Sequence, residues 1–316
     1  MSWAARGSVT GTVPCHLNFE FMIPFFNRIK LSLAYIGKKA CTWTAAIYTI
    51  AGLLSLFVSF EGIFAKDATF FCKFLIAAAL LFGVWLICAI TIAIMVGFQR
   101  KKKVVEGRNG KAVYVLYGDL FDPEIVDNSK RYICFVVNRC FDTVVDNRLI
   151  SSTSVHGIAF NKLYQQNLTT PDALNTKIQG AIKGNPTFDM IDQTSKPKGN
   201  LKRYEVGTYA NLSIDANLNY LLLGLTWFDS NLNAWSSKLD YVLCVQKMIE
   251  AFDLESQGYP VLLPIIGTGR SRTNLQEREA LEYMIAAFRM NQRKISSDLY
   301  IVIYESAKNR ISIADL

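Results

Sequence analysis

The chain has 316 residues, 51% of them hydrophobic, and its mean hydropathy is positive. This length allows a small membrane unit and one soluble domain of roughly 200 residues. The net charge of +8 does not predict nucleic-acid binding, because many of the cations flank long apolar runs, where they set membrane topology. Seven cysteines without a CxxC spacing, together with only two histidines, argue against a disulfide framework and against a metal site.

Residues 1–40 form a basic N-terminal segment. A signal peptide is not expected there, because the first long apolar run begins too late and no small-residue cleavage site follows it. Residues 24–39 mix apolar side chains such as Phe25 with cations such as Arg28. This mixture is typical of an amphipathic segment that lies on an anionic membrane surface. A disordered leader would have the same composition, and the sequence does not choose between the two interpretations.

Residues 41–99 are predicted to form a transmembrane helical hairpin. Two apolar runs, 42–60 and 74–98, are each long enough to cross the bilayer, since roughly twenty helical residues span its hydrocarbon core. Neither run carries a charge or a polar face, which argues against the alternative of two buried soluble helices. Cations are more frequent outside the hairpin than in its connecting loop. This bias predicts a multi-pass protein with both termini in the cytoplasm.

Small residues recur at helical spacing along both apolar runs. Such positions allow helix backbones to approach closely in lipid, either within the hairpin or between subunits. No charge lies deep inside either run, so an ion relay is not predicted. The small residues are Ala51, Ser55 and Ser59 in the first run and Ala89, Ala93 and Gly97 in the second.

Residues 100–111 are predicted to be a basic linker, and residues 112–316 a soluble α/β domain. Apolar runs with β-branched residues alternate with stretches of helical periodicity, which indicates helices on both sides of a mixed sheet. A capping box is predicted from Thr273 to Gln276, and the polar stretch 169–202 is predicted to be a long loop. The predicted strands cover 112–116, 132–137, 218–227, 261–266 and 299–304, and the predicted helices cover 236–252 and 273–290.

The most informative stretch of this domain, residues 264–273, reads Pro-Ile-Ile-Gly-Thr-Gly-Arg-Ser-Arg-Thr. A buried strand is predicted to lead through the Gly-Thr-Gly turn into a helix. Glycines let the backbone approach a ligand, and the free amides of a loop and of a helix start attract anions. Arg270 and Arg272 add positive charge, so the stretch indicates a phosphate site. The glycines also have a purely steric interpretation, because many strand-to-helix turns contain them.

Three further motifs precede this loop: Tyr-Gly-Asp-Leu at 117–120, Val-Val-Asn at 136–138 and Ser-Ser-Thr-Ser-Val-His-Gly at 151–157. In this order, residues 110–310 resemble a macro domain, the α/β module that binds ADP-ribose. A macro domain behind a two-helix hairpin further resembles the membrane effectors of the Thoeris anti-phage system. The resemblance implies that a TIR-domain partner makes an ADP-ribose-derived signal, a histidine conjugate in this variant, and that the effector senses it.

The resemblance also assigns site residues by position. Asp119, next to Leu120, would accept a hydrogen bond from the adenine amino group, and Asn138 would occupy the family's Val-Asn strand end. The residues alone leave other roles open: a turn or cap for Asp119, a structural strand end for Asn138, and a solvated or cap position for His156. The first phosphate loop would comprise Ser152, Thr153, Ser154, Val155, His156 and Gly157, and the second Gly267, Thr268, Gly269, Arg270 and Ser271.

Three departures from the macro-domain pattern bear on catalysis. Phe141 stands where hydrolytic members usually carry a second asparagine. The first loop is rich in serine and threonine instead of glycine, and Arg270 and Ser271 replace the usual aromatic residue of the second loop. No nucleophile–base pair is visible either. We therefore predict a binding protein and not an enzyme, with no cofactor and with an ADP-ribose derivative as its ligand.

The expected function follows from the resemblance. The chain would be a homo-oligomeric effector in the bacterial inner membrane that binds the nucleotide signal, assembles and disrupts the lipid bilayer, causing abortive infection. Nucleic acid is not an expected partner. Two alternatives stay open: a membrane-tethered hydrolase that processes ADP-ribose, and an anchor that recruits ADP-ribosylated proteins.

Overall fold

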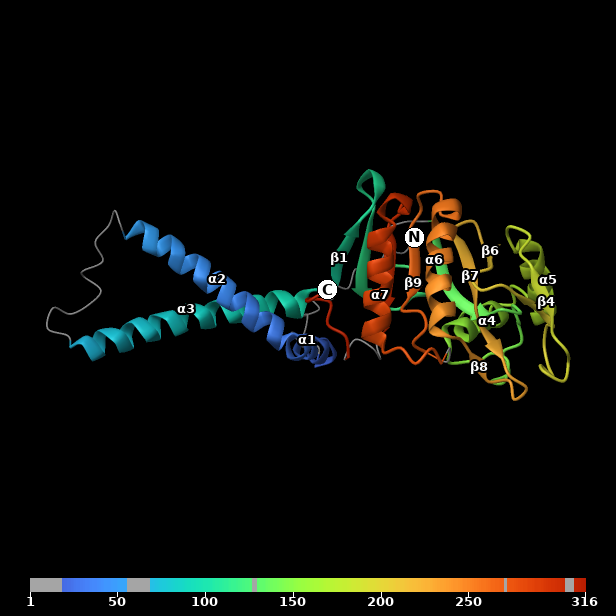
Figure 1. Cartoon of the computed structure of the whole chain (residues 1–316), viewed down its shortest axis with the longest axis horizontal. Coiled ribbons are helices and arrows are strands. Elements are labelled where there is room, and N and C mark those ends of the chain that lie inside the picture. The colour runs from blue at the N-terminus through green and yellow to red at the C-terminus, as the bar shows by residue number, and fades with distance from the viewer. Residues whose placement is uncertain (1–18, 56–68, 127–129, 270–271, 305–309) are drawn as a thin grey trace, which may run out of the picture. The chain divides into compact units, whose positions relative to one another are not determined.

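The computed structural model describes residues 19–55, 69–126, 130–269, 272–304 and 310–316, with side chains from residue 24 onward (Figure 1). The chain divides into two compact units, Met1–Phe98 and Gln99–Leu316. The first unit is helical, and the second contains the whole sheet.

The helical unit consists of α1 (Phe19–Leu31), α2 (Leu33–Leu54) and α3 (Phe70–Phe98). Among the described residues, α3 alone is long and apolar enough to cross a membrane, by length and composition. The predicted first span, 42–60, falls partly in α2 and partly outside the described residues, so the two-span hairpin stays a prediction. α2 packs against α3. The buried residues are Ile36, Ala40 and Thr44 on α2 and Cys88, Ile92, Val96 and Gly97 on α3.

The C-terminal end of α3 is packed by α1. The Phe25 ring lies directly over Gly97, where a Cβ would collide with it, and it meets Phe98 edge to face at 5.1 Å. The Arg28 Nη1 donates a hydrogen bond to the carbonyl oxygen of Gly97 at 2.9 Å. Gly97 therefore serves a contact within this unit. Of the other small residues, Ala51, Ala89 and Ala93 are half-buried, Ser55 is exposed, and Ser59 lies outside the described residues.

The second unit is built on a mixed sheet, as predicted. Its strand order is β1-β2-β10-β9-β3-β7-β6, with the short β8 (Ala234–Trp235) paired to β7. The five inner strands run parallel, and β1 and β6 are antiparallel edges. The strands are β1 (Lys101–Glu106), β2 (Ala112–Tyr117), β3 (Arg131–Asn138), β6 (Tyr209–Ser213), β7 (Leu218–Phe228), β9 (Val261–Pro264) and β10 (Leu299–Ile303).

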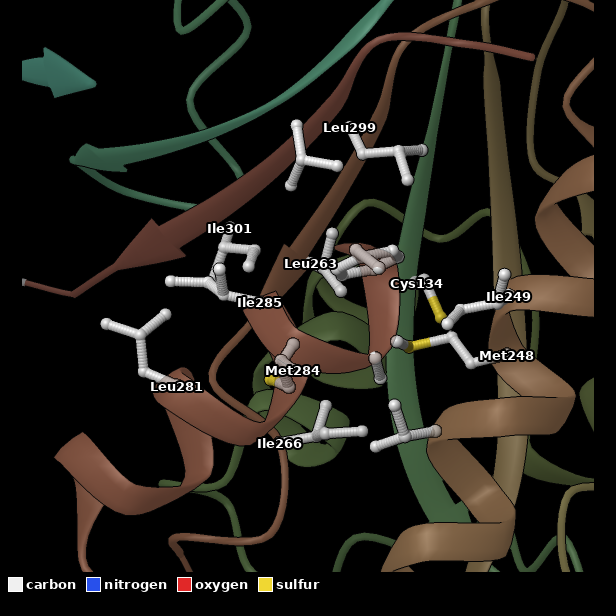
Figure 2. Close-up of a cluster of buried hydrophobic side chains, with 14 of the residues drawn as sticks. Cys134, Met248, Ile249, Leu263, Ile266, Leu281, Met284, Ile285, Leu299 and Ile301 are labelled. Carbon is white, nitrogen blue, oxygen red and sulfur yellow. The ribbon is translucent and has the colours of Figure 1, made fainter. Parts of the chain in front are cut away.

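Helices cover both faces of this sheet, because the side chains of each inner strand alternate between two cores. Tyr132 and Cys134 of β3 point into the core beneath α6 (Lys238–Glu255) and α7 (Glu277–Met290), which lie side by side in Figure 1. Figure 2 shows this core, in which Cys134 lies among aliphatic side chains of β9, β10, α6 and α7. Ile133 and Phe135 point to the other core, which α4 (Val155–Gln165) and α5 (Pro171–Ala181) cover.

Three local predictions need correction. The stretch 100–111 is not a linker throughout, because Lys101–Glu106 pairs with β2 as β1; charged residues are common on such an edge. The stretch 169–202 is not a long loop, since it contains α5 and β4 (Phe188–Met190), which pairs with β5 (Lys202–Tyr204). The capping box lies one turn later than predicted, with Gln276 as N-cap and Glu279 as its partner.

Candidate ligand-binding site

A cavity of about 710 Å³ opens at the carboxyl ends of β3, β7, β9 and β10. Parallel strands present their carboxyl ends at one edge of the sheet, which is where ligands bind in open α/β folds. The volume falls within the range of small-molecule sites. The sequence-predicted residues that line it are Asn138, Thr153, Ser154, Val155, His156, Gly267, Thr268 and Gly269.

One wall is the loop after β9. Gly267 has a φ of +84°, and a Cβ there would lie 2.7 Å from the Tyr241 ring, so this position requires glycine. Thr273 fixes the loop from its other end, because its hydroxyl donates to the Gly267 carbonyl oxygen at 2.5 Å. Gly269 is different, since a side chain there would meet open space within 4 Å. Arg270 and Ser271 lie outside the described residues.

The start of α4 forms another part of the wall. Ser154 is its N-cap: the hydroxyl accepts a hydrogen bond from the Gly157 amide at 3.0 Å and donates one to the Ser151 carbonyl at 2.7 Å. Helix N-termini attract anions, because their first amides have no partner within the helix. The stretch 152–157 is therefore a helix start and not only a loop. Ser152 and Gly157 do not line the cavity. The Ser152 hydroxyl donates a hydrogen bond to the Asn147 Oδ1, and Gly157 packs against the Ser151 carbonyl.

His156 lies in the first turn of α4, and it is buried and not solvated. Its ring meets Phe160 edge to face at 4.4 Å, and among the described residues the Nε2 atom has no hydrogen-bond partner. Burial lowers the pKa of His156 to about 3, so the imidazole is neutral at physiological pH.

Asn138, at the end of β3, organises the next turn. Its Oδ1 accepts hydrogen bonds from the amides of Cys140 at 3.1 Å and Asp142 at 3.4 Å. Phe141 follows with a φ of +52°, and its buried ring packs edge to face on Tyr204 at 5.7 Å. Phe141 is not among the cavity residues, so this position, where the resemblance implies an asparagine in hydrolytic members, supplies no polar atom to the cavity.

A buried ion pair stabilises this turn. The Lys196 ammonium lies 2.9 Å from Asp142 and also donates to the carbonyls of Lys198 and Asn200. Asn200 closes the network, because its side-chain amide donates to the carbonyls of Cys140 and Phe141. The strand end that carries Asn138 is thus held by a segment far along the chain.

Asp119 and Leu120 do not line the cavity. The Asp119 carboxylate accepts from the Phe121 amide at 2.9 Å, which is a turn role, while Leu120 is buried in the core on the α4 side. Contact of Asp119 with adenine stays a prediction.

Lining residues that the sequence does not predict include 147–150, the β7–β8 hairpin at 232–234, and Tyr304. A signal existed for the hairpin, since Asp229-Ser-Asn-Leu-Asn follows a strand directly and this composition is typical of a tight turn.

The charged residues on the cavity wall favour an anionic ligand. Arg148 and Arg272 contribute positive charge. The carboxylate of Glu277 accepts a hydrogen bond from the Arg310 Nη2 at 2.6 Å, so its negative charge is paired. Among the described residues, no cluster of histidine, cysteine and carboxylate side chains could hold a metal ion.

The family of the chain follows from a comparison with family models. The model described as Thoeris protein ThsA, Macro domain, matches residues 113–304, which is more than half of the chain. The chain belongs to this family. None of the curated proteins matches it.

Several solved structures are similar at low identity. The Oceanobacillus iheyensis macrodomain with MES bound is 11% identical, with a TM-score of 0.36, and covers 66% of this chain and 92% of that one. A mutant of the same macrodomain with ADPR is 12% identical, with a TM-score of 0.37 and coverages of 66% and 92%. A protein of unknown function from Bacteroides thetaiotaomicron is 10% identical, with a TM-score of 0.33 and coverages of 62% and 99%. These likenesses are too low to carry an argument.

Proposed function

We propose that this chain is a membrane-attached sensor whose macro domain binds an ADP-ribose-derived nucleotide in the 710 Å³ cavity. The observation that supports it most is the convergence of a glycine loop and a helix N-terminus at the carboxyl edge of the sheet, in a domain of the Thoeris ThsA macro family. The proposed signal is histidine–ADP-ribose made by a TIR-domain protein.

The site has the physical features that a pyrophosphate requires. Amides at the start of α4 and in the loop around Gly269 supply donors, and two arginines on the wall supply positive charge. The open space at Gly269 leaves room for the ligand to approach the backbone.

The proposed output is in the membrane. The apolar α3 anchors the chain in the bacterial inner membrane, with the macro domain in the cytoplasm. Ligand binding then favours assembly of several copies, and the assembled helices disrupt the lipid bilayer, which causes abortive infection. This step requires the assembled state to bind the ligand more tightly than the resting state, since equal affinity would shift no equilibrium.

Binding is favoured over hydrolysis by the turn after β3. Phe141 directs a buried ring onto Tyr204 instead of a polar group into the cavity, and Asn138 uses its Oδ1 to hold the turn. We therefore propose a receptor and not a membrane-tethered ADP-ribose hydrolase.

The test uses the full chain in nanodiscs, titrated by calorimetry with ADP-ribose and with histidine–ADP-ribose. Gly269→Glu places a carboxylate in the open space beside the ligand and should weaken binding at least about 100-fold, whereas Gly269→Ala is the matched control and should bind nearly normally. Absence of binding to the parent chain would refute the proposal.

Particle mass should be followed in the same titrations. Growth of the particle with ligand, together with leakage from liposomes, supports the effector. Binding without growth supports an anchor for ADP-ribosylated proteins, and release of free ADP-ribose from a modified protein supports the hydrolase.

A further inference from the structure

Arg272 connects two elements that border the cavity. Its Nη2 donates a hydrogen bond to the Asn233 Oδ1 at 3.1 Å, and its guanidinium carbon lies 5.0 Å from the centre of the Trp235 ring. Arg272 and Asn233 both line the cavity, Arg272 from the loop after β9 and Asn233 from the β7–β8 hairpin. The hairpin therefore supports a side chain that belongs to the glycine loop.

The hairpin is itself held by one carboxylate. Asp229 accepts hydrogen bonds from the Asn233 amide at 2.8 Å and from the Trp235 Nε1 at 3.0 Å. These hydrogen bonds lower the pKa of Asp229 to about 2, and the bond from the Asn233 backbone amide has the largest effect. The carboxylate is therefore charged at physiological pH. Asn233 and Trp235 are thus fixed before any ligand arrives.

Arg272 forms no ion pair with any residue that the structure describes. Its hydrogen-bond partner is the neutral side-chain amide of Asn233. Glu277, the carboxylate on the same cavity wall, is instead bonded by Arg310 at 2.6 Å and 2.9 Å. A guanidinium has five N–H donors, and the bond to Asn233 uses one of them.

We propose that Arg272 is a specificity-determining residue that binds an oxyanion of the nucleotide, a phosphate group, through its remaining donors. A planar guanidinium recognises phosphate with two parallel hydrogen bonds, and the support from Asn233 and Trp235 orients that plane in advance. Asp229 and Trp235 are then positioning residues that act through Arg272. This inference rests on the proposed function, because it concerns the same cavity.

The first experiment compares two probes on the full chain in nanodiscs: ADP-ribose, which carries phosphates, and adenosine, which does not. Arg272 has a φ of +50°, so Arg272→Asn is the variant of choice, since asparagine tolerates this backbone. The variant should bind ADP-ribose roughly 10- to 100-fold more weakly than the parent chain, and its affinity for adenosine should be unchanged. Arg272→Lys keeps the positive charge but lacks the planar guanidinium with its paired N–H donors. It should therefore recover only part of the lost affinity.

Arg293→Gln is the matched control, because it removes one exposed cation that does not line the cavity. It should leave the affinity for ADP-ribose within about twofold, since an exposed distant charge is screened. An equal loss in Arg293→Gln and Arg272→Asn would mean that overall charge, and not Arg272, determines affinity, and it would overturn the inference.

The second experiment tests positioning with a double-mutant cycle. Trp235→Leu should weaken ADP-ribose binding several-fold in the parent chain and have no further effect in Arg272→Asn, because it acts through that arginine. Additive losses would overturn the positioning role. The outcomes also separate the two proposals: if the parent chain does not bind ADP-ribose, the proposed function fails, whereas normal binding by Arg272→Asn refutes only the role of Arg272.

Discussion

The two units place the same kinds of side chain in opposite environments. In the macro domain, Leu222 and Leu262 are 0% exposed between the sheet and its helices, whereas Phe82 and Ile87 on α3 are 60% and 67% exposed. A water-soluble domain buries such side chains because transfer out of water stabilises the fold. An apolar helix that leaves such side chains exposed is suited to lipid, because its backbone hydrogen bonds are satisfied within the helix. The comparison teaches that the macro domain makes its own core, while the described residues leave most of the apolar surface of α3 uncovered, as in the membrane anchor proposed above.

A charge placed in each unit tests this difference most strongly. Leu263→Arg, in the buried strand β9, should prevent folding of the macro domain, because an unpaired charge would lie in a core without water (Figure 2). Ile87→Arg, near the middle of α3, should leave that domain folded but cost about 2.5–3.5 kcal/mol of membrane insertion. ADP-ribose binding and the fraction that resists alkaline extraction from membranes report the two outcomes. Retention of Ile87→Arg in the membrane at the level of Ile87→Leu would contradict the dependence of α3 on lipid.

The macro domain also contains a buried polar network, and its loss is the next largest expected effect. Asp142→Ala leaves the Lys196 ammonium, which is 0% exposed, without its carboxylate and should destabilise the domain by about 3–5 kcal/mol. The double change Asp142→Ala with Lys196→Met removes the stranded charge and should recover part of that loss. Denaturant midpoints for the three chains provide the measurement, and a double variant no more stable than the single one would contradict this account.

Much of the fold was predictable because its inner strands are parallel and buried on both faces. Such strands are continuous apolar runs, so the sequence predicts β3, β7 and β9, and it predicts β3 and β7 to within a residue at each end. β1 is not predictable from its composition, because it begins with three lysines. Lysines fit a strand at the edge of a sheet, and only the tertiary structure shows that β1 is an edge. α5 was missed because its polar face outweighs the two side chains it buries, Leu174 and Ile178.

The site was predictable only where one continuous stretch of chain forms it. The loop around Gly267 and the start of α4 carry local signals, a glycine where the structure has a positive φ and a serine at the N-cap position. Asn233 reaches the cavity through the pairing of β8 with β7, and the turn after β3 is held by Lys196; both contacts depend on tertiary structure. His156 lies in a helix and not in a loop because Ser154 caps α4, and a serine at this position is a helix-start signal in the sequence.

His156 offers a pH test of burial in the macro domain. Its folded pKa of about 3 lies below the unfolded value of 6.5, so between these values the unfolded chain binds the extra proton. Stability should therefore fall as pH decreases below 6.5, with this residue contributing up to about 1.4 kcal/mol per pH unit. His156→Leu should remove that share of the slope between pH 6.5 and 5, above the range where most carboxylates titrate. Equal slopes for the two chains, measured by denaturant unfolding, would mean that His156 becomes protonated within the folded state.

The smallest expected effect concerns the close contact between Gly97 and Phe25 in the helical unit. Gly97→Ala places a methyl group against the Phe25 ring and should weaken the packing of α1 by about 1 kcal/mol, whereas Gly83→Ala meets nothing within 4 Å and is the matched control. Looser packing exposes the backbone beside Lys30, so trypsin should cut there about fivefold faster in Gly97→Ala, the ratio that 1 kcal/mol gives. Equal cleavage of the two variants would show that lipid, and not the fit of Phe25 on Gly97, keeps α1 in place. The packing of α1 against α3 would then be maintained by the surrounding lipid and not by the fit of the two helices.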